Sequence, residues 1–365
     1  MAPYTTETAD ITAQPEKIGL LIVNLGTPQA PTARAVRPYL AEFLGDPRII
    51  ELPRLLWLAV LHGIILNVRP RRSAKVYRSI WLNRDDHGEE GSPLLRNAER
   101  QAEALRAELG DQMEVALAMR YGEPSVVAGL DQLRQANVRR LIVLPMFPQY
   151  SATTVGSIFD AVADALKNWR WVPDLRFITH YYDDPAYIDA LASSIRCYWD
   201  RHGQAEKLVL SYHGLPQTYV DKGDPYQAQC YATTAALVQA LGLNEADYMT
   251  VFQSRFGPSE WLQPYFSDTM EHLPEHGITS VQVAAPSFSV DCLETLEEIA
   301  IAGEESFHEA GGKDFAYIPC LNDDAQHMAM FKNLVLRNIQ DWLEPTQAEV
   351  SYSANGQTRA VGAPH

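Results

Sequence analysis

With 365 residues, 46% of them hydrophobic, the chain is long enough for a large buried core, arranged as two domains or as one α/β unit with two halves. The formal net charge of -16 argues against a nucleic-acid partner, because neutralising phosphates requires clustered lysine and arginine. The same acidic balance is common among soluble enzymes, so it does not identify a substrate.

Both ends of the chain are predicted to flank the folded part. Residues 1–17 lack a charged start followed by an apolar core, so we expect a disordered lead-in and no signal peptide. Residues 346–365 are expected to form a flexible tail. The four cysteines lie far apart and form no CxxC pair. This spacing favours reduced thiols in a cytoplasmic protein over a disulfide framework or structural zinc.

One apolar segment, residues 52–68 (LPRLLWLAVLHGIILNV), is followed at once by Arg69, Arg71 and Arg72. It contains an arginine and a histidine and is shorter than a full bilayer span. A buried helix is one explanation of this pattern. The alternative is an amphipathic lip, residues 52–72, that makes peripheral contact with the inner face of a membrane while its arginines meet lipid phosphates.

The clearest pattern is an internal repeat. In the first half, apolar runs end in a turn three times, at GLLIVNLGTP (19–28), VALAMRYGEP (115–124) and LIVLPMFPQYS (141–151). The series recurs in order in the second half, at KLVLSYHGLP (207–216), MTVFQSRFGP (249–258) and VQVAAPSFS (281–289). The Arg-x-Gly-x-Pro and Arg-Phe-Gly-Pro endings fall in matching places, so we expect two similar structural units.

Short runs rich in Val, Ile and Leu, bounded by Gly and Pro, predict strands buried on both faces. Helical patterns lie between them, at residues 97–108, 157–169 and 227–243. The alternation predicts an α/β fold of two similar doubly wound, Rossmann-like lobes with parallel sheets, at residues 18–183 and 184–345. Ligands of such sheets bind beyond the carboxyl ends of the strands, so the six turns should line one cleft between the lobes.

His213 is the first candidate for chemistry in that cleft. No GxGxxG, GxxxxGK[ST], HExxH or GxSxG motif occurs at the strand ends, so nicotinamide, ATP and acyl-serine chemistry lack their usual support. His213 follows an apolar run and precedes Gly214, which should point its imidazole into the cleft. A lone histidine is more often structural, but a strand-end loop favours function. A neutral imidazole there can accept a proton or bind a metal.

A row of acids opens the helix predicted after the last repeated strand. Asp291, Glu294 and Glu298 are three and four residues apart, so they share one face of an α-helix, and Glu305 continues it. Acids in a first turn can simply oppose the helix dipole on a solvated face. Neighbouring leucines indicate a packed helix instead, where carboxylates are costly without cations. We therefore expect raised pKa values and a divalent-metal or proton-relay role.

A third group combines cations, hydroxyls and aromatic rings. Its members are Met119, Arg120, Tyr121, Gln149, Tyr150, Ser151, Ala152, Thr153, Thr154, Gln253, Ser254, Arg255 and Trp261. Together they describe a pocket for a flat apolar ligand that carries carboxylates.

These residues, taken together, resemble the ferrochelatases. The motifs NLGTP, FPQYSATT, SYHGLP, FQSRFGPSEWL, CLETLEE and PCLND occur in this order, and the resemblance extends over residues 18–336. The resemblance implies an enzyme that inserts ferrous iron into protoporphyrin IX to form protohaem. It implies His213 and Glu294 as catalytic and metal-contacting residues, with Asp291 and Glu298 beginning a metal or proton path.

The resemblance also assigns a porphyrin pocket. The positions that match residues lining it or holding its propionates are Met119, Arg120, Tyr121, Tyr150, Ser151, Thr153 and Trp261. In the mechanism this implies, a distorted macrocycle exposes its pyrrole nitrogens to iron. His213 would accept pyrrole protons or present the metal, and Glu294, on the opposite side, would do the complementary task.

Several positions depart from the family pattern. Cys292 stands where many relatives have histidine, and Ala300 and Ala302 interrupt the acidic row. Ala152 occupies the place of one iron–sulfur ligand and no cysteine follows Cys320, so we expect no iron–sulfur cluster. We expect no other tightly bound cofactor, with Fe²⁺ acting as a substrate. Residues 82–90 form an unusually long segment whose histidine is best explained by a solvated loop.

Other functions fit part of the pattern. They are a coproporphyrin ferrochelatase, a non-catalytic haem or porphyrin carrier, a chelatase for another metal or tetrapyrrole, and a bilobal solute-binding protein. The chain length, the apolar lip and the CLETL run favour protoporphyrin over coproporphyrin.

Overall fold

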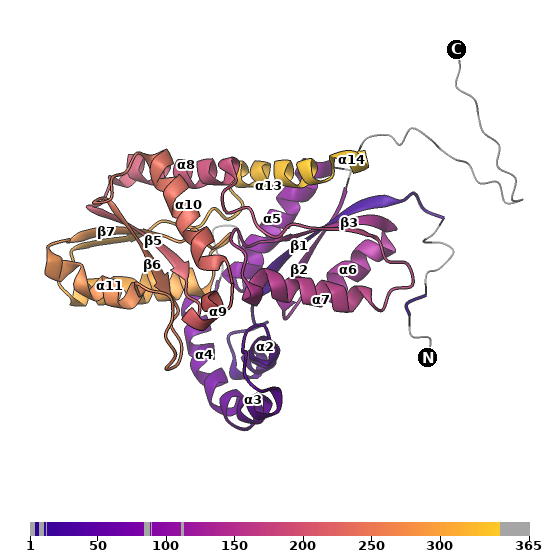
Figure 1. Ribbon diagram of the computed structural model, residues 1–365, viewed down its shortest axis with the longest axis horizontal. Coiled ribbons are helices and arrows are strands. Elements are labelled where there is room, and N and C mark those ends of the chain that lie inside the picture. Colours follow the sequence, from indigo (N-terminus) through magenta and orange to yellow (C-terminus); the bar gives the residue numbers. More distant parts are fainter. Residues whose placement is uncertain are drawn as a thin grey trace, which may run out of the picture.

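The computed structural model describes residues 4–6, 11, 13–83, 88, 90–110 and 113–343. Its strands form two four-stranded sheets, one in each lobe, and every pairing is parallel (Figure 1). The N-terminal sheet has the order β2-β1-β3-β4, with β1 (Lys17–Gly26), β2 (Met113–Tyr121), β3 (Val138–Pro145) and β4 (Asp174–Phe177). The C-terminal sheet has the order β6-β5-β7-β8, with β5 (Lys207–His213), β6 (Tyr248–Gln253), β7 (Ser280–Ala284) and β8 (Asp314–Tyr317). The predicted α/β fold of two similar lobes is confirmed.

The two sheets follow the same order, so each strand has a counterpart four places later in the chain. One detail of the predicted match is wrong. The Met119 N–H donates to the carbonyl of Pro124, and the Phe252 N–H donates to that of Pro264. Pro264 is therefore the counterpart of Pro124, and not Pro258. The sequence misleads here because the loop after β6 is longer than the loop after β2, and its Arg-Phe-Gly-Pro turn lies within the extra length.

Helices cover both faces of each sheet, as buried parallel strands require. Those of the first half are α2 (Ala33–Gly45), α3 (Arg54–Val60), α4 (Leu66–Ile80), α5 (Pro93–Leu109), α6 (Val126–Gln135) and α7 (Ser157–Leu166). Those of the second half are α8 (Pro185–His202), α9 (Gln217–Asp221), α10 (Tyr226–Leu241), α11 (Phe266–His272), α12 (Glu304–Glu309), α13 (Ala325–Asn338) and α14 (Gln340–Leu343). Short segments complete them: the π-helical η1 (Leu61–Ile65), η3 (Ala152–Gly156) and η5 (Glu294–Gly303), and the 3-10 helix η4 (Pro274–His276). The three predicted helical patterns correspond to α5, α7 and α10.

The helix that follows the fourth strand of each lobe crosses to the other lobe. Helix α8, after β4, packs on α10, and α13, after β8, packs on α5 (Figure 1). Helix α14 continues onto the N-terminal sheet, where the Arg140 guanidinium donates to the Trp342 carbonyl at 3.0 Å. Helix α13 also packs on α8, so residues 325–343 contact both lobes, although we placed them in the C-terminal one. The helix patterns alone do not reveal this, because either lobe could cover the same apolar stripe.

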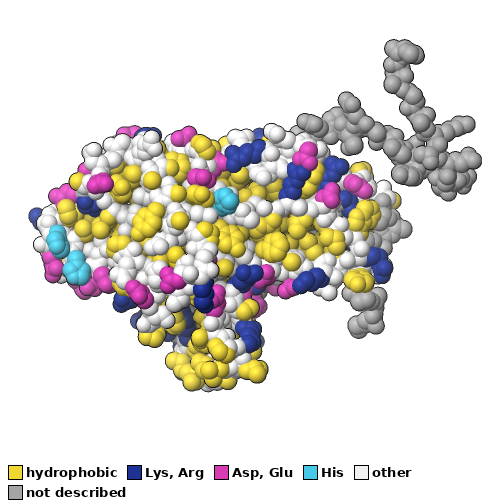
Figure 2. Space-filling model, viewed as in Figure 1, with side chains coloured by type: hydrophobic (Ala, Val, Ile, Leu, Met, Phe, Trp, Pro, Cys, Tyr) yellow, Lys and Arg dark blue, Asp and Glu magenta, His cyan; other side chains and the backbone are white. Residues whose placement is uncertain are grey.

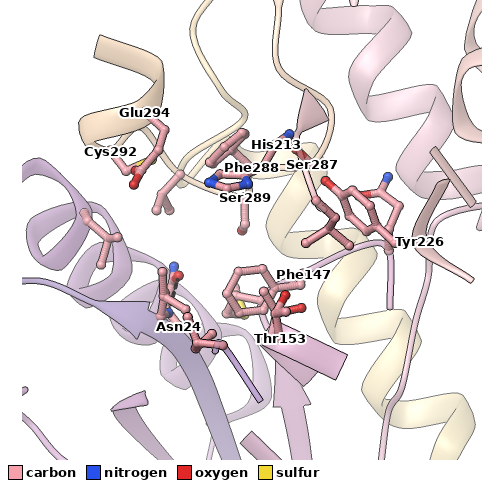
Figure 3. A pocket seen from close by; sticks show the side chains of 18 of the residues that line it. Asn24, Phe147, Thr153, His213, Tyr226, Ser287, Phe288, Ser289, Cys292 and Glu294 are labelled. Atoms are coloured by element: carbon pink, nitrogen blue, oxygen red, sulfur yellow. Dashed lines mark hydrogen bonds between the residues drawn. The ribbon is translucent and has the colours of Figure 1, made fainter. Parts of the chain in front are cut away.

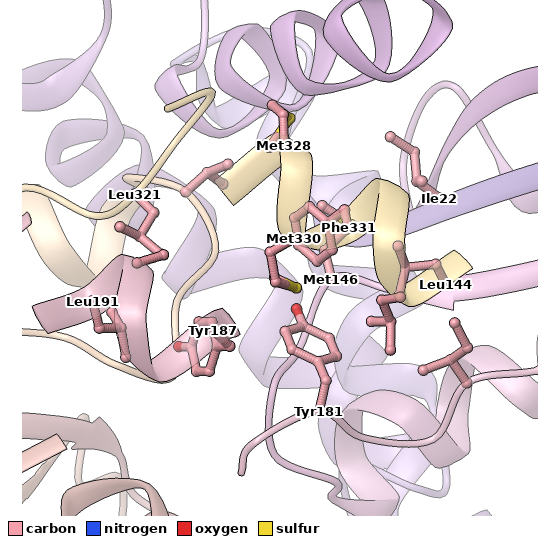
Figure 4. Packing of buried hydrophobic residues seen from close by; sticks show 14 of the residues in the cluster. Ile22, Leu144, Met146, Tyr181, Tyr187, Leu191, Leu321, Met328, Met330 and Phe331 are labelled. Atoms are coloured by element: carbon pink, nitrogen blue, oxygen red, sulfur yellow. The ribbon is translucent and has the colours of Figure 1, made fainter. Parts of the chain in front are cut away.

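One hydrophobic core extends through both lobes because of this exchange. Tyr181 lies near its middle, with edge-to-face contacts at 5.5 Å to both Tyr187 of α8 and Phe331 of α13 (Figure 4). Leu144 and Met146, at the end of β3, belong to the same cluster. The lobes are thus held in one relative position, which matters for any site between them.

The core also buries one titratable group, His327 of α13. Its side chain is fully buried and its Nδ1 donates to the carbonyl of Asn322 at 2.9 Å. Burial lowers the pKa of His327 from 6.5 to about 4, although the bond to Asn322 opposes part of that shift. The imidazole is therefore neutral in the folded protein throughout the mildly acidic range.

The free energy of unfolding is expected to fall as the pH is lowered, because His327 is buried in its neutral form. Below pH 6.5 the unfolded chain binds a proton at His327 that the folded chain does not bind until about pH 4. The free energy of unfolding should lose about 1.4 kcal/mol per pH unit from this group, or about 2 kcal/mol by pH 5. Urea unfolding at about pH 7.5 and about pH 5 measures how much the free energy of unfolding drops between the two pH values. This drop should be about 2 kcal/mol smaller in His327→Gln than in the unchanged chain. Equal losses in both proteins would contradict the assignment.

The apolar segment at residues 52–68 forms α3, η1 and the start of α4, which project from the N-terminal lobe with an apolar outer surface (Figure 2). Leu55, Leu56 and Val68 are 87%, 66% and 69% exposed, whereas Leu61 and Leu66 are buried against α2. The buried-helix explanation is wrong for the outer face, since helix periodicity does not tell which stripe is covered. Among the helices that the structure describes, none has the length and apolar character to cross a bilayer.

Some residues of the segments that flank the folded part lie within the described structure. The Thr5 N–H donates to the Asn168 carbonyl at 2.8 Å, and the Asn137 side chain donates to the Gln14 carbonyl at 2.6 Å. The described residues of the lead-in therefore contact the N-terminal lobe. The tail and most of the 82–90 loop lie outside the described residues.

Candidate active site

A pocket between the lobes is lined by residues from the carboxyl ends of four strands, two in each sheet (Figure 3). Its empty space is about 800 Å³, part of which is open to solvent. The lining residues come from β1 (Asn24, Leu25), α2 and α5 (Phe43, Leu94), the turn before α3 (Ile49), the segment after β3 (Met146, Phe147, Gln149, Thr153, Thr154), the β5 end and α10 (His213, Leu215, Tyr226), and the segment after β7 (Ser287, Phe288, Ser289, Val290, Cys292, Glu294). The turns after β2 and β6 do not line it, because these strands lie at the sheet edges.

His213 reaches this pocket from the last position of β5. Its Nδ1 lies 2.7 Å from the carbonyl oxygen of Gly214. A carbonyl only accepts, so Nδ1 carries the proton of the neutral ring and Nε2 keeps its lone pair. Gly214 is required at the turn, since a Cβ there would come within 2.7 Å of the Gln253 carbonyl oxygen. The strand end thus holds an imidazole whose free nitrogen can take a proton or contact a metal.

Glu294 lines the same pocket from the start of η5 (Figure 3). Cys292 lies beside it, and burial together with the charge of Glu294 raises the pKa of that thiol. His213 and Glu294 both come from the C-terminal lobe, and Figure 3 shows them along the same wall, with Asn24 and Phe147 of the N-terminal lobe facing them. The carboxylate and the imidazole therefore line one pocket from the same lobe, and the expected placement of Glu294 opposite His213 across a bound ring stays a prediction.

Glu294 and Glu298 of the acidic row lie on the π-helix η5, not on the expected α-helix, whereas Asp291 precedes η5 and Glu305 lies on α12. Hydrogen bonds from residue i to i+5 widen the turn, so the α-helical spacing rule does not describe its faces. Glu298 accepts hydrogen bonds at 2.5 Å from both the N–H and the hydroxyl of Ser254. Burial raises the pKa of Glu298, opposed by Ser254 and by the nearby His213. Burial and the surrounding glutamates raise the pKa of Glu297, as expected for clustered acids.

Asp291 is buried and held away from the pocket lining. One carboxylate oxygen accepts hydrogen bonds from the Tyr317 hydroxyl at 2.6 Å, the Thr295 hydroxyl and the Cys320 N–H, and the other accepts one from the Asn322 amide at 2.7 Å. With these donors its oxygens are occupied. Asp291 anchors the start of η5 to the loop after β8.

Arg120 and Tyr121 meet at Asp46, and none of the three is among the pocket-lining residues. The Arg120 guanidinium lies 2.5 Å from the Asp46 carboxylate, which also accepts from Tyr121 at 2.8 Å and Ser157 at 2.6 Å. Burial by itself would raise the pKa of Asp46. Hydrogen bonds from Ser157, the Arg48 N–H and Tyr121, together with the charge of Arg120, outweigh burial, so the pKa is lowered. The structure therefore uses both predicted pocket residues to hold the turn at Asp46.

Of the segment after β3, only part reaches the pocket. Thr153 lines it, and Ser151 lies 2.9 Å from the Thr153 hydroxyl while donating to Asp224 at 3.0 Å. The Tyr150 N–H donates to Gln229 of α10 at 2.6 Å. Ser151 and Tyr150 thus join the N-terminal lobe to the C-terminal lobe beside the pocket.

Met119 and Trp261 also lie outside the pocket lining. Met119 is fully buried in β2. Trp261 lies against the turn that follows His213, since a Cβ added at Gly214 would come within 3.3 Å of the Trp261 ring. Its indole N–H donates to the Phe256 carbonyl at 2.8 Å. Trp261 therefore supports the turn that carries the imidazole.

The structure adds pocket residues that the sequence reading did not single out. Asn24, Phe147, Tyr226 and Phe288 all line the cavity. Three of them lie in or next to the strand-end turns that we had aligned, so the repeat itself was the signal. Asp46 had no comparable signal, since its partners are distant in the chain.

No group of three or more His, Cys, Asp and Glu side chains is placed to hold a metal ion among the described residues. The four cysteines are free thiols. That His213 and Glu294 contact the metal stays a prediction. The expected lack of an iron–sulfur cluster stays a prediction.

Comparisons with known proteins give a consistent result. A family model described as Ferrochelatase matches residues 17–339. A curated ferrochelatase from Thioalkalivibrio sulfidiphilus is 51% identical over 353 residues, covering 96% of this chain and 93% of that protein. One from Azoarcus sp. strain BH72 is 46% identical over 368 residues, covering 100% of this chain and 99% of that protein.

Solved structures agree with the fold. SirB from Bacillus subtilis with Fe³⁺ matches with a TM-score of 0.53 and 10% identity, covering 90% of this chain and 98% of that one. The sirohydrochlorin chelatase SirB from Bacillus subtilis subspecies spizizenii, in complex with cobalt, matches with a TM-score of 0.51 and 11% identity, covering 89% and 96%. At this identity the likeness concerns the two-lobe fold alone. On the family match and the close relatives, the chain belongs to the ferrochelatase family, the lyases that insert ferrous iron into a porphyrin in haem biosynthesis.

Proposed function

We propose that protoporphyrin IX is the macrocycle and that it binds between the lobes with His213 and Glu294 at its metal-accepting centre. The observation that carries the proposal is that an imidazole whose Nε2 keeps its lone pair and a carboxylate line one largely apolar pocket. Leu25 and Phe43 from one lobe and Phe288 from the other offer apolar contacts to a flat ring. Fe²⁺ is the second substrate.

Two protons must leave the pyrrole nitrogens as iron enters. His213 accepts a proton at Nε2, while the Gly214 carbonyl stabilises the resulting imidazolium through Nδ1. Glu294 takes the second proton, or it contacts the metal while the second proton passes to solvent. Imidazole and carboxylate oxygen suit this task because they bind iron without the retention that thiolates would cause. The raised pKa values of Glu297 and Glu298 support a path by which protons or iron pass along η5.

We propose a positioning role for Asp291 in place of the expected role in a metal or proton path. Its carboxylate already accepts four hydrogen bonds, so it positions the start of η5 and with it Glu294. Arg120, Tyr121 and Tyr150 likewise act on the pocket through the segments that they hold. Ser151 and Trp261 do the same for the Thr153 and His213 turns.

The exposed apolar lip supports peripheral contact of a cytoplasmic protein with the inner face of a membrane. Leu55 and Leu56 of α3 project outward, and Arg71 and Arg72 of α4 are exposed nearby in the chain. Apolar side chains that enter the acyl boundary, with arginines at the phosphates, form an interfacial anchor. An apolar porphyrin could then reach the pocket from the lipid side.

Replacing Leu55 and Leu56 by serine is expected to weaken binding to anionic phospholipid vesicles by at least about tenfold, because each leucine contributes roughly 1.5–3 kcal/mol when buried. Co-sedimentation with the vesicles measures this. The matched control is Val127→Ser with Val172→Ser, two exposed apolar residues elsewhere. If both double variants sediment like the unchanged chain, the lip is not a membrane contact.

One anaerobic assay tests the central proposal. The protein is mixed with Fe²⁺ and either protoporphyrin IX or coproporphyrin III, and the absorption change of metallation is followed. We expect turnover that is several-fold faster with protoporphyrin IX. Preference for coproporphyrin III would overturn the choice of macrocycle, and tight porphyrin binding without turnover would indicate a carrier.

A further inference from the structure

A short helix of the C-terminal lobe holds the segment that begins the lip. Helix α9 starts four residues after His213, and its Tyr219 contacts the main chain at residues 49–51 of the N-terminal lobe. The Tyr219 hydroxyl donates to the Ile49 carbonyl at 3.0 Å and accepts from the Glu51 N–H at 3.3 Å. Lys222 adds an ion pair with Glu51 at 2.5 Å. We call this set of contacts the clasp.

The clasp acts on the pocket because Ile49 is one of its lining residues. On the N-terminal side, the Ile49 N–H donates to the Asp46 carbonyl at 3.1 Å. On the C-terminal side, Leu215 lines the pocket between His213 and the start of α9. Ile49 is thus held between a turn of one lobe and a helix of the other, because the Tyr219 hydroxyl bonds to the Ile49 carbonyl and to the N–H of Glu51.

We propose that Tyr219 is a positioning residue: through the clasp it sets the Ile49 wall and the start of the lip against the His213 loop, and so sets porphyrin affinity. This inference rests on the proposed function. One phenol hydroxyl satisfies both an acceptor and a donor of the same short segment, which a phenylalanine cannot do. The Lys222–Glu51 pair is exposed and contributes less, with an effect that falls as salt rises.

Tyr219→Phe removes the hydroxyl and keeps the ring. Because residue 51 is exposed, its freed N–H can bond to water, so the melting temperature should stay close to that of the unchanged chain. We expect KM for protoporphyrin IX to rise about threefold to tenfold, as for the loss of one or two hydrogen bonds, with kcat within about twofold. The matched control is Tyr231→Phe on α10, whose ring packs against Phe252 at 6.0 Å.

Hydrogen exchange provides a readout that does not depend on activity. In the protein without porphyrin, the Glu51 amide should exchange several-fold faster in Tyr219→Phe than in Tyr231→Phe. In a second test, Lys222→Glu should raise KM modestly at low salt, and Glu51→Lys combined with it should restore the original value. The pair Lys332–Glu108, 2.9 Å apart on the surface, serves as the charge-reversal control.

The outcomes separate the two proposals. If the unchanged chain inserts iron but Tyr219→Phe matches Tyr231→Phe in both KM and exchange, the clasp has no positioning role. If the unchanged chain neither binds porphyrin nor inserts iron, the proposed function is wrong, and the exchange comparison still decides whether the clasp holds residues 49–51.

Discussion

His213→Ala is expected to lower the rate of iron insertion by at least about 100-fold while leaving protoporphyrin affinity within about threefold. The general-base contribution of a positioned side chain is typically 10²–10⁴-fold, which is the reason for the large effect on rate. Affinity should survive because the ring contacts come mainly from apolar residues such as Leu25 and Phe288. The variant also removes a side chain that is only half-buried, so folding should be retained.

Rates are measured anaerobically by the absorption change of metallation, and affinity by quenching of porphyrin fluorescence. His180→Ala is the control, since His180 is an exposed histidine that bonds to Thr179 outside the pocket lining. Near-normal turnover in His213→Ala would remove the imidazole from the mechanism. A large loss of affinity with normal maximal rate would instead make His213 a binding residue.

Asp46→Ala is expected to destabilise the fold by about 3–5 kcal/mol, the cost of removing one partner of a buried ion pair. The Asp46 carboxylate is almost fully buried and bonds to Arg120, Tyr121 and Ser157, which would all lose their acceptor. The turn that carries Ile49 would lose its anchor as well, so porphyrin affinity should also fall. Urea unfolding at neutral pH measures the free energy.

Asp160→Ala is the matched control for this variant. Asp160 pairs with Arg48 at 2.7 Å, but both side chains are 41% exposed. Exposed ion pairs contribute about 1 kcal/mol or less, so this change should have a small effect. If the free energy of unfolding decreases by similar amounts in the two variants, the hydrogen-bond network at Asp46 does not stabilise the fold in the way that its burial indicates.

The strands and the pocket could be predicted from the sequence to a large extent. A short apolar run such as Leu20–Val23, bounded by Gly and Pro, indicates a strand buried on both faces, and the turn that follows it lies at the carboxyl end. His213 was found for this reason, because its place at a strand end depends on its immediate neighbours. Asp46 could not be found in this way, since its partners Arg120 and Ser157 are 74 and 111 residues away.

By itself, the sequence determined the two-lobe parallel architecture, the family and the imidazole in the cleft, because each depends on local patterns repeated along the chain. Only the tertiary structure decided which face of the lip is exposed, that α8 and α13 exchange lobes, and that η5 is a π-helix. It also decided that Arg120 and Tyr121 support a turn outside the pocket lining. These features follow from which surfaces meet across long stretches of chain, and packing partners of that kind leave no periodic signal in the residues themselves.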